Sequence, residues 1–285
     1  MKQPSAEQFL ETCGAPGPLQ FEVVYPDQRA TIRLTLPLPF ALVGRDEHAD
    51  LPLNDARVSL RHTYLQVVAG RLWWADLDSR GGTHGRESRQ STGLLDSGER
   101  LGVGPFHIRL LGGCLPDPAE PSSLPNPFSS DSYDRLSLPR IRLDFVEGTA
   151  KPSLWTVDRL LTLVGRDSCC KVRLHSPLVS RTHCALLHTA AGLWAVDLRG
   201  REGLHVNGTP VRWALLEDAD ELRIGSFRIR VHAPGTLSTF PSATIATNGS
   251  PSATALVPSR PFAETLPAEL GSLLSSGVPL APLSS

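Results

Sequence analysis

This sequence of 285 residues has almost no net charge, few aromatic residues and no long apolar run. Its 28 lysines and arginines nearly balance its 29 aspartates and glutamates, which leaves a formal net charge of −1. Because a protein that binds nucleic acid through phosphates needs a basic surface, this balance argues against a nucleic-acid partner. No segment approaches the roughly 20 apolar residues that cross a bilayer, and the N-terminal residues lack the apolar centre of a signal peptide. We therefore expect a soluble, cytoplasmic protein that does not bind membranes.

Cysteines are few as well, and their spacing does not indicate a metal site. The five cysteines are odd in number, two are adjacent, and none forms the Cys-x-x-Cys pair typical of zinc sites. We therefore expect free thiols in a reducing compartment, no metal and no cofactor. The residues are Cys13, Cys114, Cys169, Cys170 and Cys184.

An internal repeat organises the chain. The segment LVGRD at residues 42–46 returns at residues 163–167, so that Gly44 corresponds to Gly165 at a separation of 121 residues. The same separation relates Ser59 to Ser180 and Trp73 to Trp194, and no gap is needed over residues 42–109. The chain therefore contains two copies of one module.

Short alternating segments predict strands in each copy. Residues 32–36 and 106–110 alternate apolar with polar or small residues, the period of a half-buried strand, and residues 193–196 and 222–224 behave similarly. Turn residues interrupt the chain at short intervals, as they do in β-sandwiches. We predict an all-β protein with one sandwich at residues 20–112 and a second at residues 139–232. A Pro/Ser-rich linker at residues 113–138 joins them, and a disordered Ser/Thr/Pro/Ala-rich tail occupies residues 233–285.

Four motifs follow one another in the same order in both copies. They are a Gly-Arg pair at 44–45 and 165–166, a Ser-x-x-His block at 59–62 and 180–183, an Asp-Leu block at 76–83 and 197–203, and a closing block at 95–104 and 216–225. This order resembles the forkhead-associated (FHA) family over residues 20–112 and 139–232. The resemblance implies two FHA-like sandwiches in tandem, whose loops bind phosphothreonine in an extended peptide.

The resemblance also implies the site residues. Arginine and serine side chains can give a phosphate charge-assisted hydrogen bonds, which are stronger than neutral ones. The residues implied in phosphopeptide binding are Arg45, Ser59, Arg61, Ser79, Arg80 and Thr83 in copy one, and Arg166, Ser180, Arg181 and Arg201 in copy two. The residues implied in shaping the loops are Gly44, His62, Gly82, Gly165, His183 and Gly203.

The two copies depart from the family pattern in different ways. Copy one has Leu60 where copy two has Arg181, and the family's asparagine is Gly81 in copy one and Glu202 in copy two. A carboxylate at Glu202 is expected to repel a phosphate. Because copy two keeps more of the phosphate cluster, the pattern favours copy two as the phosphate-binding module.

Three functions follow from these patterns. The first is a phosphothreonine-dependent adaptor in Ser/Thr kinase signalling, whose partner is a kinase or its substrate. The second is a structural scaffold whose FHA-like domains bind proteins without phosphate, which the departures above favour. The third is a hydrolase built on Ser59, His62 and Asp76, but the sequence has no nucleophile elbow or oxyanion loop around them, so we predict that the protein is not an enzyme.

Overall fold

A computed structural model describes residues 4–26, 31–86, 88–115, 126–134, 138–147 and 153–233. The predicted tail from residue 234 onward lies outside the described residues, as do residues 116–125 and 135–137 of the predicted linker. The described residues of the two copies belong to one compact unit. No helix within these ranges is long and apolar enough to span a membrane.

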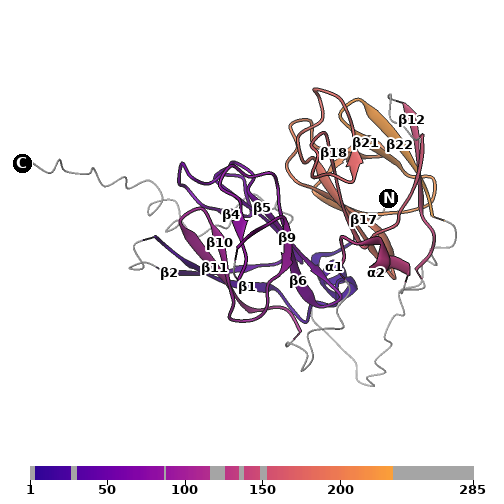
Figure 1. Cartoon of the computed structure of the whole chain (residues 1–285). Coiled ribbons are helices and arrows are strands. Elements are labelled where there is room, and N and C mark those ends of the chain that lie inside the picture. Colours follow the sequence, from indigo (N-terminus) through magenta and orange to yellow (C-terminus); the bar gives the residue numbers. More distant parts are fainter. Residues whose placement is uncertain are drawn as a thin grey trace, which may run out of the picture. The chain divides into compact units, whose positions relative to one another are not determined.

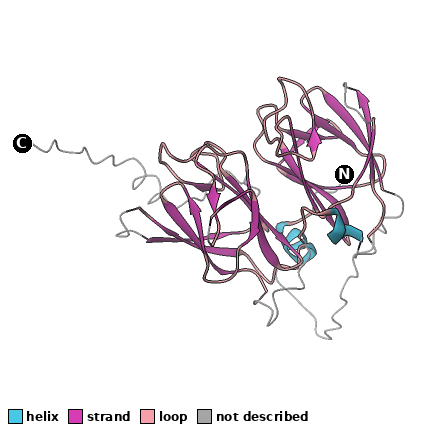
Figure 2. Ribbon diagram, in the orientation of Figure 1, coloured by secondary structure: helices cyan, strands magenta, loops and turns pink. Residues whose placement is uncertain are grey.

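Copy one is a sandwich of two sheets (Figures 1 and 2). The first sheet has the strand order β2-β1-β11-β10-β7-β8 and the second has the order β4-β3-β5-β6-β9. The strands of the first sheet are β1 (Leu19–Val24), β2 (Thr31–Leu36), β7 (Thr83–His84), β8 (Arg89–Gln90), β10 (Arg100–Val103) and β11 (Phe106–Gly112). Those of the second sheet are β3 (Phe40–Gly44), β4 (Leu51–Pro52), β5 (Thr63–Val68), β6 (Arg71–Asp76) and β9 (Thr92–Leu94).

Copy two repeats this topology strand for strand. Its sheets have the orders β13-β12-β22-β21-β18-β19 and β15-β14-β16-β17-β20. The strands of the first are β12 (Arg142–Glu147), β13 (Leu154–Thr156), β18 (Leu204–Val206), β19 (Thr209–Val211), β21 (Glu221–Ile224) and β22 (Phe227–His232). Those of the second are β14 (Leu161–Gly165), β15 (Val172–Arg173), β16 (Cys184–Thr189), β17 (Gly192–Asp197) and β20 (Trp213–Leu216). The prediction of two β-sandwiches is confirmed.

The sheet containing β16 and β17 is buried on both of its faces. Side chains alternate across a strand, so neighbours in sequence point to opposite faces. In β17, Leu193 and Ala195 pack into the core of copy two, whereas Trp194 and Val196 pack into the hydrophobic cluster of copy one. The strand therefore reads as a continuous apolar run instead of an alternating one, as strands buried on both faces do.

A short helix, α1 (Ala6–Thr12), precedes copy one and was not predicted from the sequence. Ser5 and Gln8 form a capping box: the Gln8 N–H donates to Ser5 Oγ at 3.2 Å and the Ser5 N–H donates to Gln8 Oε1 at 2.9 Å. The helix buries Phe9 and Leu10, and the Phe9 ring stacks on Trp194 with centroids 4.1 Å apart. Phe9 of α1 thus joins the hydrophobic cluster of copy one to Trp194 of copy two.

A second helix, α2 (Ser130–Asp134), lies in the segment predicted as linker. Phe128 and Tyr133, on either side of its start, are partly buried against the hydrophobic clusters. This part of the segment therefore packs on the sandwiches, because its aromatic side chains gain more from burial than from exposure to water.

Candidate functional site

The Gly-Arg corner brings the predicted arginine and serine together in each copy. The Arg45 N–H donates to the Ser59 carbonyl at 2.9 Å, and the Arg166 N–H donates to the Ser180 carbonyl at 3.1 Å. In copy one the Arg45 side chain also donates from Nε to the Val58 carbonyl at 3.3 Å. The backbone thus holds an exposed arginine beside the serine loop in both copies.

Glycine is required at this corner by the close approach of the loop. A Cβ at Gly44 would lie 2.1 Å from the Leu60 carbonyl oxygen, and a Cβ at Gly165 would lie 2.1 Å from the Arg181 carbonyl oxygen. Both obstacles are backbone atoms, which cannot swing aside as a flexible side chain does. An added methyl group would therefore push the serine loop away from the strand.

We expect Gly165→Ala to lower the free energy of unfolding by about 1–3 kcal/mol, the usual cost of overpacking. Gly17→Ala is the matched control, because a Cβ at Gly17 meets nothing within 4 Å and should change stability by less than about 0.5 kcal/mol. Denaturant unfolding of the full chain measures both. Equal effects of the two substitutions would contradict the close approach described for Gly165.

The serine hydroxyl is oriented in the same way in both copies. Ser59 Oγ accepts a hydrogen bond from the Arg80 N–H at 3.0 Å, and Ser180 Oγ accepts one from the Arg201 N–H at 3.0 Å. A hydroxyl that accepts in this way keeps its own proton available for donation. The serine loop and the Asp-Leu loop are thereby joined, with a donor left for a ligand.

The two predicted loop histidines are buried, with both ring nitrogens bonded to backbone. The Ser59 N–H donates to His62 Nδ1 at 3.2 Å, so Nε2 carries the proton and donates to the Gly82 carbonyl at 3.1 Å. His183 has the same partners in copy two, the Ser180 N–H and the Gly203 carbonyl. Burial lowers the pKa of both imidazoles, which favours this neutral form.

These bonds also bear on the hydrolase hypothesis. A Ser-His-Asp triad needs a histidine nitrogen that accepts the serine hydroxyl proton and a second nitrogen that donates to the aspartate. Both nitrogens of His62 are occupied by backbone groups, while Asp76 accepts from other side chains. Ser59, His62 and Asp76 therefore do not form a triad.

Ser79 and Thr83 are buried within the Asp-Leu block and bond to its first residue, Asp76. Asp76 Oδ1 accepts from Ser79 Oγ at 2.5 Å and from Thr83 Oγ1 at 2.7 Å, and Asp76 Oδ2 accepts from the Ser79 N–H at 3.0 Å. Both side chains are buried, with Ser79 2% and Thr83 0% exposed. The sequence predicts both residues as phosphopeptide contacts, and in the structure their hydroxyls are bonded to Asp76.

Copy two lacks this support. Gly200 and Leu204 occupy the positions of Ser79 and Thr83, so no hydroxyl at these two positions can donate to Asp197. Within the part of the chain that the structure describes, the Asp197 carboxylate accepts one hydrogen bond, from the Gly200 N–H at 3.1 Å. Burial of this poorly bonded carboxyl raises its pKa, although the hydrogen bond from Gly200 and the neighbouring charges of Arg212 and Arg199 act in the opposite direction.

We expect Asp76→Asn to destabilise the chain at pH 7 by about 1–3 kcal/mol, because it leaves buried donors unsatisfied. Asp197→Asn should cost less than about 1 kcal/mol, since an amide oxygen can accept the one bond from Gly200. The raised pKa means that folded Asp197 holds its proton more tightly than the unfolded chain does. Its contribution to stability is therefore complete below the unfolded pKa and declines as pH rises through the folded pKa.

Unfolding titrations between pH 4 and pH 7 test this difference. The stability of Asp197→Asn relative to the unsubstituted chain should improve as pH rises, because the raised pKa of Asp197 makes the unsubstituted chain lose stability over this range. A relative stability of Asp197→Asn that falls with rising pH would contradict a raised pKa at Asp197.

The arginines divide between two pockets. A pocket of about 230 Å³ is lined by Arg166, Ser180, Arg181 and Arg201 of copy two, together with Arg61 of copy one. A smaller pocket of about 170 Å³ is lined by Arg45, Ser59 and Arg80 of copy one, and by Arg181 again. Arg61 thus lies with the predicted residues of copy two and not with those of its own copy.

Glu202 is exposed and does not line the larger pocket. Its carboxylate therefore repels a phosphate in that pocket less than the sequence implied.

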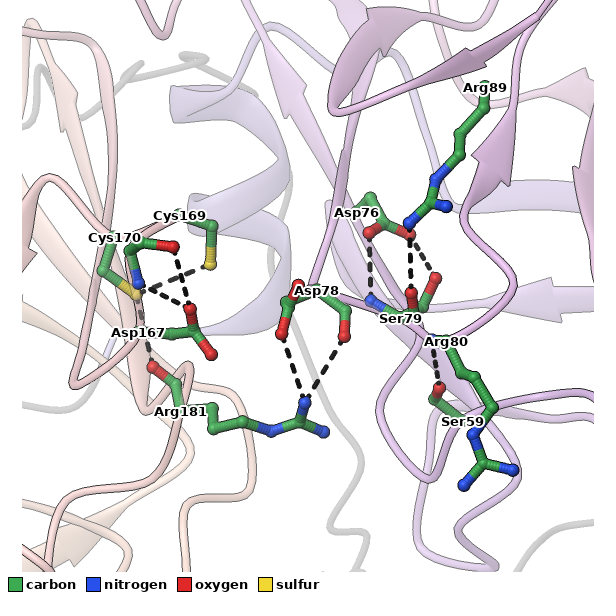
Figure 3. A network of polar contacts seen from close by, with 11 residues as sticks. Ser59, Asp76, Asp78, Ser79, Arg80, Arg89, Asp167, Cys169, Cys170 and Arg181 are labelled. Carbon is green, nitrogen blue, oxygen red and sulfur yellow. Dashed lines mark hydrogen bonds and ion pairs between the residues drawn. The ribbon is translucent and has the colours of Figure 1, made fainter.

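Arg181 connects the two copies. Its Nη1 donates to Asp78 Oδ2 at 3.3 Å and to the Asp78 carbonyl at 3.4 Å (Figure 3). Asp78 has a φ of 54°, a left-handed conformation that aspartate tolerates better than most residues. Sequence reasoning did not single out Asp78. The one available signal was a difference between the copies: Asp78 of copy one corresponds to Arg199 of copy two in the repeat, so an acidic residue replaces a basic one.

Within the described ranges, no cluster of three or more histidine, cysteine or acidic side chains is placed to hold a metal ion. The adjacent sulfurs of Cys169 and Cys170 lie 3.9 Å apart, next to Asp167, whose carbonyl accepts from the Cys170 N–H at 3.2 Å (Figure 3). The site is therefore built from arginine guanidinium groups, serine hydroxyls and backbone N–H groups, which together suit an anion.

Comparisons with known proteins agree on the domain. The family described as FHA domain matches residues 41–104 and 162–225, the segments that carry the two sets of loops. The oxoglutarate dehydrogenase inhibitor of Corynebacterium efficiens is 29% identical over 91 residues, which are 32% of this chain and 64% of that protein. The glycogen accumulation regulator GarA of Mycolicibacterium smegmatis is 28% identical over 100 residues, which are 35% of this chain and 63% of that protein. The chain thus spans less than two thirds of the length of these relatives.

Among solved structures, one is described as a structural and functional analysis of phosphothreonine-dependent FHA domain interactions. It is 26% identical to this chain, with a TM-score of 0.31, and the match covers 33% of this chain and 95% of that one.

Proposed function

Because the chain carries two FHA domains, we propose that it is a phosphothreonine-dependent protein-binding adaptor in Ser/Thr kinase signalling. Its partner is a phosphothreonine-containing protein, either a kinase or a kinase substrate. The curated relatives have the names of regulators, an inhibitor and a regulator of accumulation, which supports a regulatory role and not a catalytic one.

The observation that carries this proposal is the larger pocket, to which the second FHA domain contributes the serine and most of the arginines. Ser180 is held there with its proton free, and Arg166, Arg181 and Arg201 line the same space. A phosphothreonine carries a charge of about −1.5 to −2 and three strong acceptor oxygens, which match guanidinium and hydroxyl donors. The side chains of this pocket therefore favour a phosphate over a neutral threonine.

The first FHA domain has a weaker set of donors. It keeps Arg45, Ser59 and Arg80, but Leu60 replaces the arginine that follows the serine in the second domain. Leu60 is 54% exposed and offers a phosphate no hydrogen bond. We propose that the second domain binds the phosphate more tightly.

A library titration of the full chain tests the proposal. Immobilised peptides with a fixed phosphothreonine and degenerate flanks should retain the chain, whereas the same library with threonine should not. Equal retention by both libraries, or retention by neither, would overturn the adaptor proposal.

One observation favours the second candidate, a scaffold that binds without phosphate. The Arg181 side chain is already paired with Asp78, and such a contact can serve packing alone. The scaffold proposal predicts equal retention by the two libraries, so the same experiment separates the two candidates.

A further inference from the structure

Arg61 of the first FHA domain lies against the loops of the second. Its Nη1 donates to the Arg199 carbonyl at 2.9 Å and lies 3.5 Å from the carbonyls of Thr182 and Leu198. These carbonyls belong to the two loops that carry Ser180 and Arg201. Arg61 therefore reaches across to the phosphate loops of the neighbouring domain, and not to those of its own.

The larger pocket is consequently built from both domains. Five arginines and one aspartate line it, so its surroundings carry a large positive excess. Burial lowers the pKa of the half-buried Arg61, and the nearby charge of Arg181 lowers it further. Two guanidinium groups held close together repel each other unless an anion lies between them. The five are Arg61 of the first domain and Arg166, Arg181, Arg199 and Arg201 of the second.

We propose that the phosphate of a phosphothreonine peptide is bound between the two FHA domains, with Arg61 of the first domain donating to the same phosphate as Arg166 and Arg181 of the second. A guanidinium has five N–H donors, so Arg61 can contact the loop carbonyls through Nη1 and a phosphate through its other nitrogens. The proposal rests on the function proposed above and adds that the site is incomplete in either domain alone.

Asp78 is the internal competitor for this phosphate. Its carboxylate occupies Arg181, but both side chains of the pair are about half exposed, at 51% for Arg181 and 54% for Asp78. An ion pair so exposed to water is weak. A phosphate dianion brings more charge and more acceptors than a carboxylate, so it displaces Asp78 from Arg181.

The test is a ³¹P NMR titration of the full chain with O-phosphothreonine, followed by a pH titration of the bound phosphate. Arg61→Ala should weaken binding about 10- to 100-fold, the effect of losing a hydrogen bond to a charged group. Asp78→Asn should tighten binding by up to about fivefold, because it frees Arg181. Arg33→Ala removes the same charge from an exposed position on β2 and should leave binding unchanged.

The pKa of the bound phosphate separates contact from mere support of the loops. The second pKa of a phosphate monoester is about 6, and each cation in contact lowers it. In Arg61→Ala at saturation this pKa should rise above its value in the unsubstituted complex, and Arg61→Lys should restore part of the decrease.

An unchanged phosphate pKa, or unchanged affinity in Arg61→Ala, overturns the shared pocket. If Ser180→Ala abolishes binding while Arg61→Ala does not, the proposed function stands and the shared pocket fails. If the unsubstituted chain does not bind O-phosphothreonine, both fail.

Discussion

Replacing Ser180 by alanine is expected to weaken the binding of a phosphothreonine peptide by about 10- to 100-fold. Ser180 Oγ accepts from the Arg201 N–H and lines the larger pocket, so its own proton is available to donate to a bound phosphate. Removing a hydrogen bond to a charged group costs about 1.5–3 kcal/mol, which corresponds to this loss of affinity. Fluorescence anisotropy of a labelled peptide, titrated with the full chain, measures it.

The repeat supplies a matched control. Ser59 accepts the corresponding bond from the Arg80 N–H, so Ser59→Ala removes the same hydroxyl from the same kind of loop. Because Leu60 leaves the first domain with fewer donors, Ser59→Ala should reduce affinity less than about threefold. A larger loss from Ser59→Ala than from Ser180→Ala would place the main phosphate contact in the first domain.

Replacing Phe9 by alanine is expected to lower the free energy of unfolding by about 3–5 kcal/mol, the usual cost of removing a fully buried aromatic side chain. Phe9 is 0% exposed, its ring stacks on Trp194 at an interplanar angle of 6°, and it lies 5.9 Å from the Phe40 ring. The cavity would open between the two copies, at the point where α1 joins them. Denaturant unfolding of the full chain measures the change.

Leu111→Ala is the control for this truncation. Leu111 is apolar but 38% exposed, so its removal should cost less than about 1 kcal/mol. If Phe9→Ala costs no more than Leu111→Ala, then α1 does not contribute to packing as its contacts with Trp194 and Phe40 indicate.

The repeat made most of the fold predictable. Because residues 42–109 match the second copy without a gap, each strand in that range implies a strand at the corresponding position of copy two. The strand orders of the four sheets agree with this. Turn residues and alternation then indicate sandwiches, because few other folds accommodate so many short strands.

Two features of the packing were missed for physical reasons. The capping box at Ser5 and Gln8 was a readable signal for α1, but a helix of two turns lacks the length that makes helical periodicity stand out. The apolar run around Trp194 predicts a strand, but a strand that is apolar on both faces must also pack against a hydrophobic layer on each face. The sequence does not show that the second layer comes from copy one.

For the candidate site, spacing indicates which loops supply the residues but not how their side chains are arranged. Spacing identified the loops that carry Arg166, Ser180 and Arg181, and these do line one pocket. Spacing does not reveal which way a loop side chain points: the hydroxyl of Thr83, a predicted phosphopeptide contact, bonds to Asp76 in the structure. Nor does it reveal contacts between copies, so Arg61 was assigned to its own domain.

The most direct test of phosphate recognition is calorimetry of the full chain with one phosphothreonine peptide and with the same peptide bearing threonine. We predict that the phosphorylated peptide binds at least about tenfold more tightly, since each charge-assisted hydrogen bond to the phosphate contributes about 1.5–3 kcal/mol. Equal affinity for the two peptides would contradict phosphate recognition and would leave the two FHA domains as a scaffold.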